Sequence, residues 1–304
     1  MNYLRIVLFE RRPVIMTSKF LIADLKISVT SDYDKNLELS HGPYKFDFEG
    51  KPDVEFVVLK SDDLIENKYS EVTKLCPGKY YSKSENCDVL IDYDEKSGTI
   101  LATTVFSCDY SRVEITKYDV KKLYDISDEC FVVNLIDSAM HYVIRKFGGI
   151  VFHSSAISFN GEGVVFSAES GTGKSTHTSL WQKEFEGVHI INDDTPIIRA
   201  FPDGKVMLYG TPWAGSTGIN SNEAVPLRAI VFLSRGETNS IEKTNFFAVM
   251  QKFFDAMVSP LSNEMFSDVA DTLSEICKNV PIYNLSCNMN HDAAHVAKKQ
   301  IFKD

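Results

Sequence analysis

The hydrophobic positions follow two different patterns along the 304 residues of the chain. Up to about residue 126, apolar residues form short runs or alternate with polar ones, which is typical of β-strands with one buried face. Further on, apolar runs of strand length alternate with stretches of helical spacing, which predicts an α/β core. We therefore divide the chain into a β-rich region, residues 17–126, and a second domain, residues 127–304.

The β-rich region is predicted to be antiparallel. Asp94–Gly98 is rich in turn formers and separates two apolar runs, which predicts a hairpin. The strands that we expect are Thr17–Val29, Val54–Leu59, Val89–Tyr93, Thr99–Phe106 and Ser111–Tyr118. This region contains no catalytic motif, so we expect it to select the acceptor molecule on which the second domain acts.

The first 16 residues are interpreted as a non-native extension from an upstream start codon. Arg5 and the apolar run Ile6–Phe9 resemble a signal peptide, but the run is too short and charged residues follow it. Met16 offers an internal start, and the predicted strand pattern begins directly after it.

The second domain is predicted to open with a helix that Ser127 caps and that ends at Gly148–Gly149. Strands and helices then alternate. The predicted strands are Ile150–Phe159, Val164–Ser167, Val188–Ile191, Ile197–Ala200, Val206–Tyr209, Leu227–Leu233 and Pro281–Leu285. The predicted helices run from Lys174 to about Phe185 and over residues 245–258, 263–278 and 292–302.

The segment Ala168–Ser175 matches the phosphate-loop pattern, except that Ala168 replaces its first glycine. Its glycines let successive N–H groups converge on one anion, and the following helix points its positive end there. Lys174 adds a cation, and Ser175 offers a hydroxyl to Mg²⁺. The alternative is a plain turn before a helix, but the flanking strand and helix favour ATP binding. The predicted nucleotide-binding residues are Glu169, Ser170, Gly171, Thr172, Gly173, Lys174, Ser175 and Thr176.

Asp193 and Asp194 follow the apolar run Val188–Ile191, which we place beside the strand of the phosphate loop. A bend after that strand turns both carboxylates toward one site. We assign Asp193, with Ser175, to Mg²⁺ and Asp194 to the proton of an attacking hydroxyl. The alternative is a turn ahead of Thr195-Pro196, where aspartate is common.

Three motifs give the second half of the chain a resemblance to a known family. Phe152–Ala156, Ser167–Ser175 and Asn192–Asp194 resemble the HPr kinase/phosphorylase family of phosphoenolpyruvate carboxykinase-like P-loop proteins. Gly210–Trp213 and Pro226–Ile230 look like segments of HPr-kinase-related proteins encoded beside peptide-modification genes.

The resemblance implies a phosphoenolpyruvate carboxykinase-like kinase domain with a mixed sheet. It also implies that His153 lies near the active site and that Glu169 stands where the family has a carboxylate. The chain departs from the pattern at Ala168-Glu169, where the family usually has Gly-Asp. Residues 17–126 do not look like the family's N-terminal domain, so HPr itself is not carried over as the substrate.

Three other candidates have alternatives that the sequence leaves open. Gly210–Gly218, with Trp213, is a binding loop or a long connector. Arg228 and Arg235 stabilise a transferred phosphoryl group or form surface ion pairs. His177, one helical turn before Trp181, is expected to pack against the sheet.

Composition narrows the class of protein. The net charge of −10 disfavours nucleic acid as a partner, because a phosphate backbone needs a basic face. No apolar run is long enough to span a bilayer. Six cysteines without metal-ligand spacing suit free thiols in the cytoplasm.

These observations together predict a cytoplasmic kinase that uses ATP and Mg²⁺. Its catalytic residues are expected to be His153, Lys174, Asp193 and Asp194. The acceptor is a hydroxyl of a peptide, a protein or a small molecule, and a homo-oligomer is compatible with the sequence. The rival interpretation is a nucleotide-binding regulatory or assembly module that transfers nothing.

Overall fold

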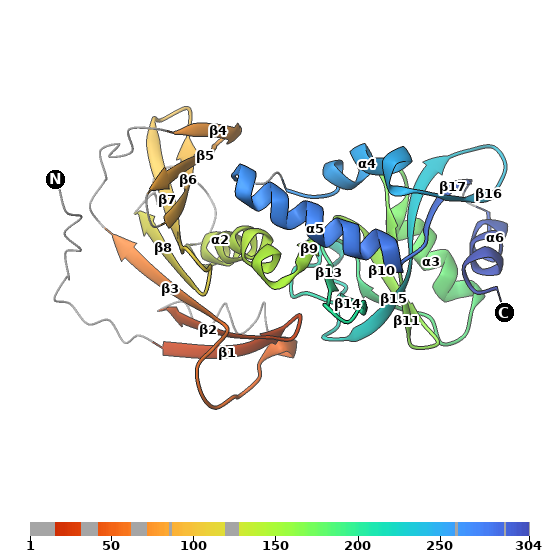
Figure 1. Cartoon of the computed structure of the whole chain (residues 1–304), viewed down its shortest axis with the longest axis horizontal. Coiled ribbons are helices and arrows are strands. Elements are labelled where there is room, and N and C mark those ends of the chain that lie inside the picture. Colours follow the sequence, from red (N-terminus) through yellow and green to blue (C-terminus); the bar gives the residue numbers. More distant parts are fainter. Residues whose placement is uncertain are drawn as a thin grey trace.

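Two β-sheets form the frame of the chain, and helix α2 (Asp128–Val143) lies between them (Figure 1). The structure is a computed structural model. It describes residues 16–31, 42–61, 72–84, 87–118, 128–258, 261–288 and 290–303. The interpretation of residues 1–16 and the cap at Ser127 fall on residues outside these ranges, except for Met16.

The first sheet has eight strands. In spatial order they are β1 (Met16–Ile22), β2 (Leu25–Ser31), β3 (Val54–Ser61), β8 (Arg112–Tyr118), β7 (Thr99–Ser107), β6 (Cys87–Asp94), β5 (Lys79–Ser84) and β4 (Thr73–Cys76). The predicted hairpin of β6 and β7 is confirmed. The prediction of an antiparallel region is wrong in part, because β3 runs parallel to both of its neighbours.

The predicted single strand Thr17–Val29 is also wrong. Ala23 and Asp24 both have positive φ, 52° and 60°, which makes them the two-residue turn of a hairpin between β1 and β2. Neither residue is the glycine that usually marks such a turn. Apolar residues alternate on both sides of it and only Ala23 and Asp24 separate the two runs, so the pattern alone suggested one strand.

Helix α2 packs its apolar side on the first sheet. Its buried residues share one hydrophobic cluster with strand residues such as Phe56 and Phe106. The short 3-10 helix Ile144–Phe147 continues α2 and ends at Gly148, whose φ of 67° favours glycine. The predicted end of the helix is therefore confirmed.

The second sheet is mixed. Its main path runs through β12 (His189–Asn192), β10 (Ser155–Phe159), β11 (Glu162–Ser167), β15 (Ala224–Arg235), β14 (Val206–Tyr209), β13 (Ile197–Ala200) and β9 (Gly149–Val151). Strand β15 also pairs in parallel with β17 (Ile282–Cys287), which pairs with β16 (Ser240–Thr244). Strand β16 was not predicted.

The predicted strand Ile150–Phe159 is wrong as a single element. It is broken at residues 152–154, and β9 and β10 pair with different partners. In the break, the Phe152 amide donates to Pro196 O and the His153 amide donates to Ala256 O. These bonds satisfy the two backbone amides in the break and place His153 just before β10.

Helices cover both faces of the second sheet, which confirms the predicted α/β core. Helices α3 (Lys174–Glu184) and α6 (Asp292–Ile301) pack on one face, and α4 (Phe246–Asp255) and α5 (Asn263–Asn279) on the other. On α3, Trp181 is fully buried and His177 is 3 % exposed, and both rings pack against Phe166 of β11, as predicted. Trp181 also donates a hydrogen bond to His177.

Three side chains fix the first sheet to the second. Arg199 of β13 donates to Ala23 O over 2.6 Å, and the hydroxyl of Tyr209 in β14 donates to Asp24 over 2.5 Å. Tyr44, from the segment after β2, donates to Ser221 O over 2.9 Å. The turn of the first hairpin is therefore docked onto the sheet that carries the candidate site.

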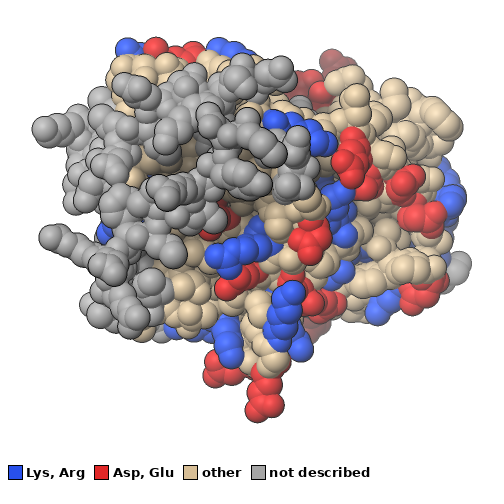
Figure 2. All heavy atoms as spheres, turned by 60° about the vertical axis from the view of Figure 1, so that its left-hand side comes forward, with Lys and Arg blue, Asp and Glu red and all other residues tan. Residues whose placement is uncertain are grey.

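The surface of the N-terminal side carries charges of both signs. Figure 2 shows lysine and arginine side chains interspersed with aspartate and glutamate over the described part of this face. Among the described residues, no helix is long and apolar enough to cross a membrane.

Candidate active site

The loop between β11 and α3 is open on its concave side. Gly171 and Gly173 have φ of 75° and 113°, and a Cβ atom added to either would meet nothing within 4 Å. Helix α3 begins at Lys174, and no side chain caps its N-terminus. The first-turn N–H groups are thus available to an anion, and this donor set fits a phosphate group.

Lys174 lies close to the carboxylates of Asp193 and Asp194. Its ammonium group donates to Ala168 O over 3.0 Å. Burial lowers the pKa of Lys174, and the two carboxylates oppose this shift by attraction. Loop, cation and carboxylates therefore interact in one region of the structure, and the roles assigned to them stay predictions.

Of the two candidate arginines, Arg235 reaches the loop. It lies at the end of β15 and donates to Gly171 O over 2.7 Å. Arg228, near the other end of β15, donates to Ile301 O over 3.2 Å and pairs with Glu162 at 3.5 Å. Arg228 therefore forms an ion pair, which was the alternative interpretation of this residue.

A hollow of about 820 Å³ opens beside the loop. His153, Arg235 and the α4 residues Lys252 and Asp255 contribute to its wall. The predicted loop residues Glu169, Ser170 and Thr172 also line it. Thr176 instead borders a neighbouring hollow on the far side of the loop. The size is ordinary for a small-molecule site.

Asn192, the last residue of β12, turns the chain so that both aspartates leave the sheet. Its Oδ1 accepts from the amides of Asp194 and Thr195 at 2.9 and 2.8 Å. Its Nδ2 donates to Thr211 O and Trp213 O, both at 3.0 Å. This asparagine supplies the bend that the sequence interpretation required.

Asp193 and Asp194 have different surroundings. Asp193 is 7 % exposed and accepts from the Ser155 hydroxyl at 2.5 Å. Ser155 also lies 2.9 Å from the hydroxyl of Thr178 on α3, and Thr178 donates to Ser175 O. Asp193 is thus joined to the turn that carries Ser175, which is itself exposed.

The Asp194 carboxylate is open to solvent on one side. Its side chain is 32 % exposed, and His153 Nδ1 lies 3.1 Å from its Oδ1. His153 is also partly exposed, so both groups can reach a bound molecule. The residue that the resemblance placed near the site therefore contacts the carboxylate that we assigned as the base.

The predicted adjacency of the two strands is wrong, because β10 lies between β11 and β12. Both strands are antiparallel to β10, so they run in the same direction and end at the same edge of the sheet. His153 and Ser155 stand at that edge between the loop and the aspartates. The loop after β11 and the aspartates after β12 therefore still meet at one edge of the sheet, although β10 separates the two strands.

The segment Gly210–Gly218 is anchored in its first half. Thr195 donates to Trp213 O over 2.8 Å, in addition to the bonds from Asn192. The Trp213 ring is 9 % exposed and belongs to the cluster of α2 and the first sheet. A binding role of this segment stays a prediction, and Trp213 is a buried anchor.

Gly215 is packed against Asp194. Its φ is 57°, and a Cβ atom there would lie 2.9 Å from Asp194 Cγ. We expect Gly215→Ala to displace this carboxylate and to reduce transfer strongly. Gly218→Ala is the matched control, because Gly218 has a similar φ of 66° with nothing within 4 Å of the added Cβ. Equal transfer rates in the two variants would show that the position of Asp194 does not depend on Gly215.

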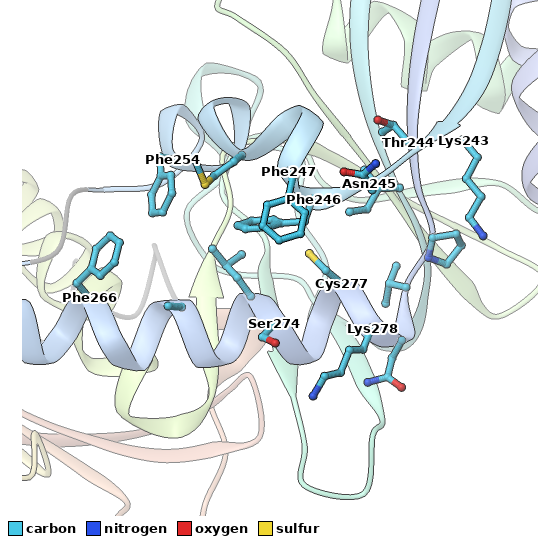
Figure 3. Close-up of a pocket in the computed structure, with 17 residues that line it drawn as sticks. Lys243, Thr244, Asn245, Phe246, Phe247, Phe254, Phe266, Ser274, Cys277 and Lys278 are labelled. Carbon is cyan, nitrogen blue, oxygen red and sulfur yellow. The ribbon is translucent and has the colours of Figure 1, made fainter.

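A second hollow, of about 940 Å³, lies between α4 and α5. Figure 3 shows that aromatic side chains, including Phe247, Phe254 and Phe266, surround it. The rings of Phe254 and Phe266 stack at 5.7 Å. Charged groups do not converge on it as they do beside the loop, so the candidate active site is the hollow at the loop.

Sequence reasoning missed two ionisable residues on α2. Asp137 and His141 lie one turn apart, with His141 Nε2 3.6 Å from Asp137 Oδ1. Burial, reinforced by Asp194, raises the pKa of Asp137 to about 7. Burial lowers the pKa of His141 to about 4. The available signal was an aspartate and a histidine at positions i and i+4 of one helix.

Fold and site together define an α/β protein in which a glycine-containing strand–loop–helix unit meets a pair of carboxylates. The family model described as "SynChlorMet cassette protein ScmC" matches residues 119–301. The chain belongs to this family. No curated protein matches the chain.

One solved structure with partial overlap is described as the Hpr(Ser) kinase/phosphatase from Coxiella burnetii. It has 10 % sequence identity and a TM-score of 0.31, and the overlap covers 49 % of this chain and 95 % of that one. This TM-score is too low to assign the chain to that fold.

Proposed function

We propose that the protein is a Mg²⁺-dependent kinase that transfers the γ-phosphoryl group of ATP to a hydroxyl. The observation that carries the proposal is the convergence of Lys174, Asp193 and Asp194 beside the open loop. Phosphoryl transfer requires positioning and charge neutralisation more than covalent chemistry from the protein. Cation, anion-binding turn and carboxylates are the groups that such a reaction needs.

Each group has a defined role in this proposal. The loop amides and Lys174 hold the terminal phosphates. Asp193 and Ser175 hold Mg²⁺, which neutralises phosphate charge when bound. Asp194 accepts the proton of the attacking hydroxyl, and His153 orients that carboxylate through their contact.

The family name supplies a first choice of acceptor. It describes a cassette protein, so peptides and proteins encoded in the same gene cassette are the acceptors to test first. A serine or threonine hydroxyl of such a product fits the proposed chemistry.

Nucleotide binding tests the first half of the proposal. We expect calorimetry to show that Mg-ATP binds at least about tenfold more tightly than AMP, because AMP lacks the phosphates that the loop would hold. Equal affinities for the two nucleotides would contradict a phosphate-binding role of the loop.

A further inference from the structure

Two polar atoms on α2 are buried without a hydrogen-bond partner. They are Asp137 Oδ1 and His141 Nδ1, and within the described chain nothing donates to or accepts from them. The side chains are 29 % and 14 % exposed, so both keep a small opening to solvent. Buried polar groups are normally satisfied, so unpaired ones indicate a ligand or a functional role.

Packing ties this part of α2 to the aspartate pair. Ile136 and Met140 flank the two residues along the helix and, with Trp213, line a small gap in the first core. Trp213 O accepts from Thr195, the residue after Asp194. One tryptophan therefore connects the helix to the turn that carries the proposed base.

Electrostatics agrees with this placement. The charge of Asp194 raises the pKa of both Asp137 and His141, and His153 lowers that of His141. Lys79 of β5 lowers the pKa of Asp137 and donates to Ser138, its neighbour on α2, over 3.0 Å. The charges of the pair, of Asp194 and of His153 therefore act on one another.

We propose that Asp137 and His141 form the acceptor half of the active site and hydrogen-bond a serine or threonine residue of a peptide or protein. This inference rests on the proposed kinase function. A carboxyl oxygen and an imidazole nitrogen suit the hydroxyl and amide groups of such a residue. The carboxyl groups of Asp137 and Asp194 disfavour an anionic ligand. We therefore expect the acceptor segment to be neutral where it meets α2.

The test uses N-acetylserine methylamide as the probe, in the presence of Mg²⁺ and a non-hydrolysable ATP analogue. Ligand-observed NMR should show saturable binding to the wild type. Asp137→Asn and His141→Phe should each weaken it by about tenfold, the loss of one hydrogen bond, with unchanged affinity for the analogue. Asn134→Ala, on the exposed side of α2, is the control and should bind as the wild type does.

Unchanged probe binding in both variants would overturn the proposal, as would absence of binding to the wild type. Failure of the kinase proposal has a different signature, because γ-labelled ATP would then leave no label on any acceptor, whether or not the probe binds beside α2.

The pH dependence of unfolding gives a second readout that needs no ligand. In Asp137→Asn, His141 remains with a folded pKa of about 4 against 6.5, so the folded state binds fewer protons and stability rises with pH between these values. In His141→Phe, Asp137 remains with a folded pKa of about 7 against 3.8, so stability falls as pH rises.

The expected slopes are opposite and approach about tenfold in the unfolding constant per pH unit. Lys79, Arg145, Asp194 and His153 also face the pair, and they are common to both variants. Each slope is read as its difference from the slope of the double variant Asp137→Asn/His141→Phe, which keeps all other titrating groups, and differences of the same sign would overturn the proposal.

Discussion

Asp194→Asn is expected to lower the rate of phosphoryl transfer ~10²–10⁴-fold while Mg-ATP affinity stays nearly unchanged, because a general base acts mainly in the transition state. Asp193→Asn is expected to weaken Mg-ATP binding as well. Asp193 is the buried member of the pair and is joined through Ser155 and Thr178 to the turn of Ser175. Calorimetric affinity measured beside single-turnover transfer separates the two effects.

A matched control is Asp268→Asn. Asp268 lies on α5, the helix that packs on the opposite face of the second sheet from α3, and it pairs with Lys146 at 2.6 Å. It should leave both measurements unchanged. If both Asp193→Asn and Asp194→Asn kept full transfer, the pair would be no more than the turn that Asn192 organises.

Lys174→Ala is expected to weaken Mg-ATP binding by about tenfold to a hundredfold and to abolish measurable transfer. A hydrogen bond to a charged group contributes about 1.5–3 kcal/mol, and each 1.4 kcal/mol is about a factor of ten in affinity. Transfer falls further, because the lysine also stabilises charge that develops on the phosphoryl group.

Lys183→Ala controls for the change in net charge, since Lys183 is an exposed lysine in the last turn of the same helix. It should behave as the wild type in the calorimetric and transfer assays. Equal losses in Lys174→Ala and Lys183→Ala would mean that overall charge, and not a contact with phosphate, explains the effect.

The chemistry-bearing segments could be predicted from the sequence because each has a local cause. Glycines between a strand and a helix specify the loop before Lys174, and an apolar strand ending in Asn192 specifies the turn with the aspartates. Helix α5 and strands β13 and β14 were also predicted closely, since their apolar periods and turn residues agree.

Pairing between distant strands could not be predicted in the same way. The break at residues 152–154 depends on bonds to Pro196 and Ala256, which lie far away in the sequence. The place of β10 between β11 and β12 depends on its pairing with both strands, and β12 follows only after helix α3. The local apolar pattern alone therefore predicted one strand where the structure has β9 and β10.

The contribution of α2 was missed for a related reason. Its apolar spacing identified the helix, but Asp137 and His141 look like ordinary polar positions until the opposite wall of the site is known. Their significance lies in burial and in the charge of Asp194, and both arise only when the first sheet docks on the second.

Transfer of label from γ-labelled ATP tests the kinase claim most directly. The full-length protein is incubated with Mg²⁺ and with the purified peptides and proteins encoded in its gene cassette, beside Lys174→Ala and Asp194→Asn. We expect one product to acquire acid-stable label on a serine or threonine with the wild type, and not with either variant. Tight Mg-ATP binding without label on any product would contradict the kinase proposal and indicate a nucleotide-binding regulatory module.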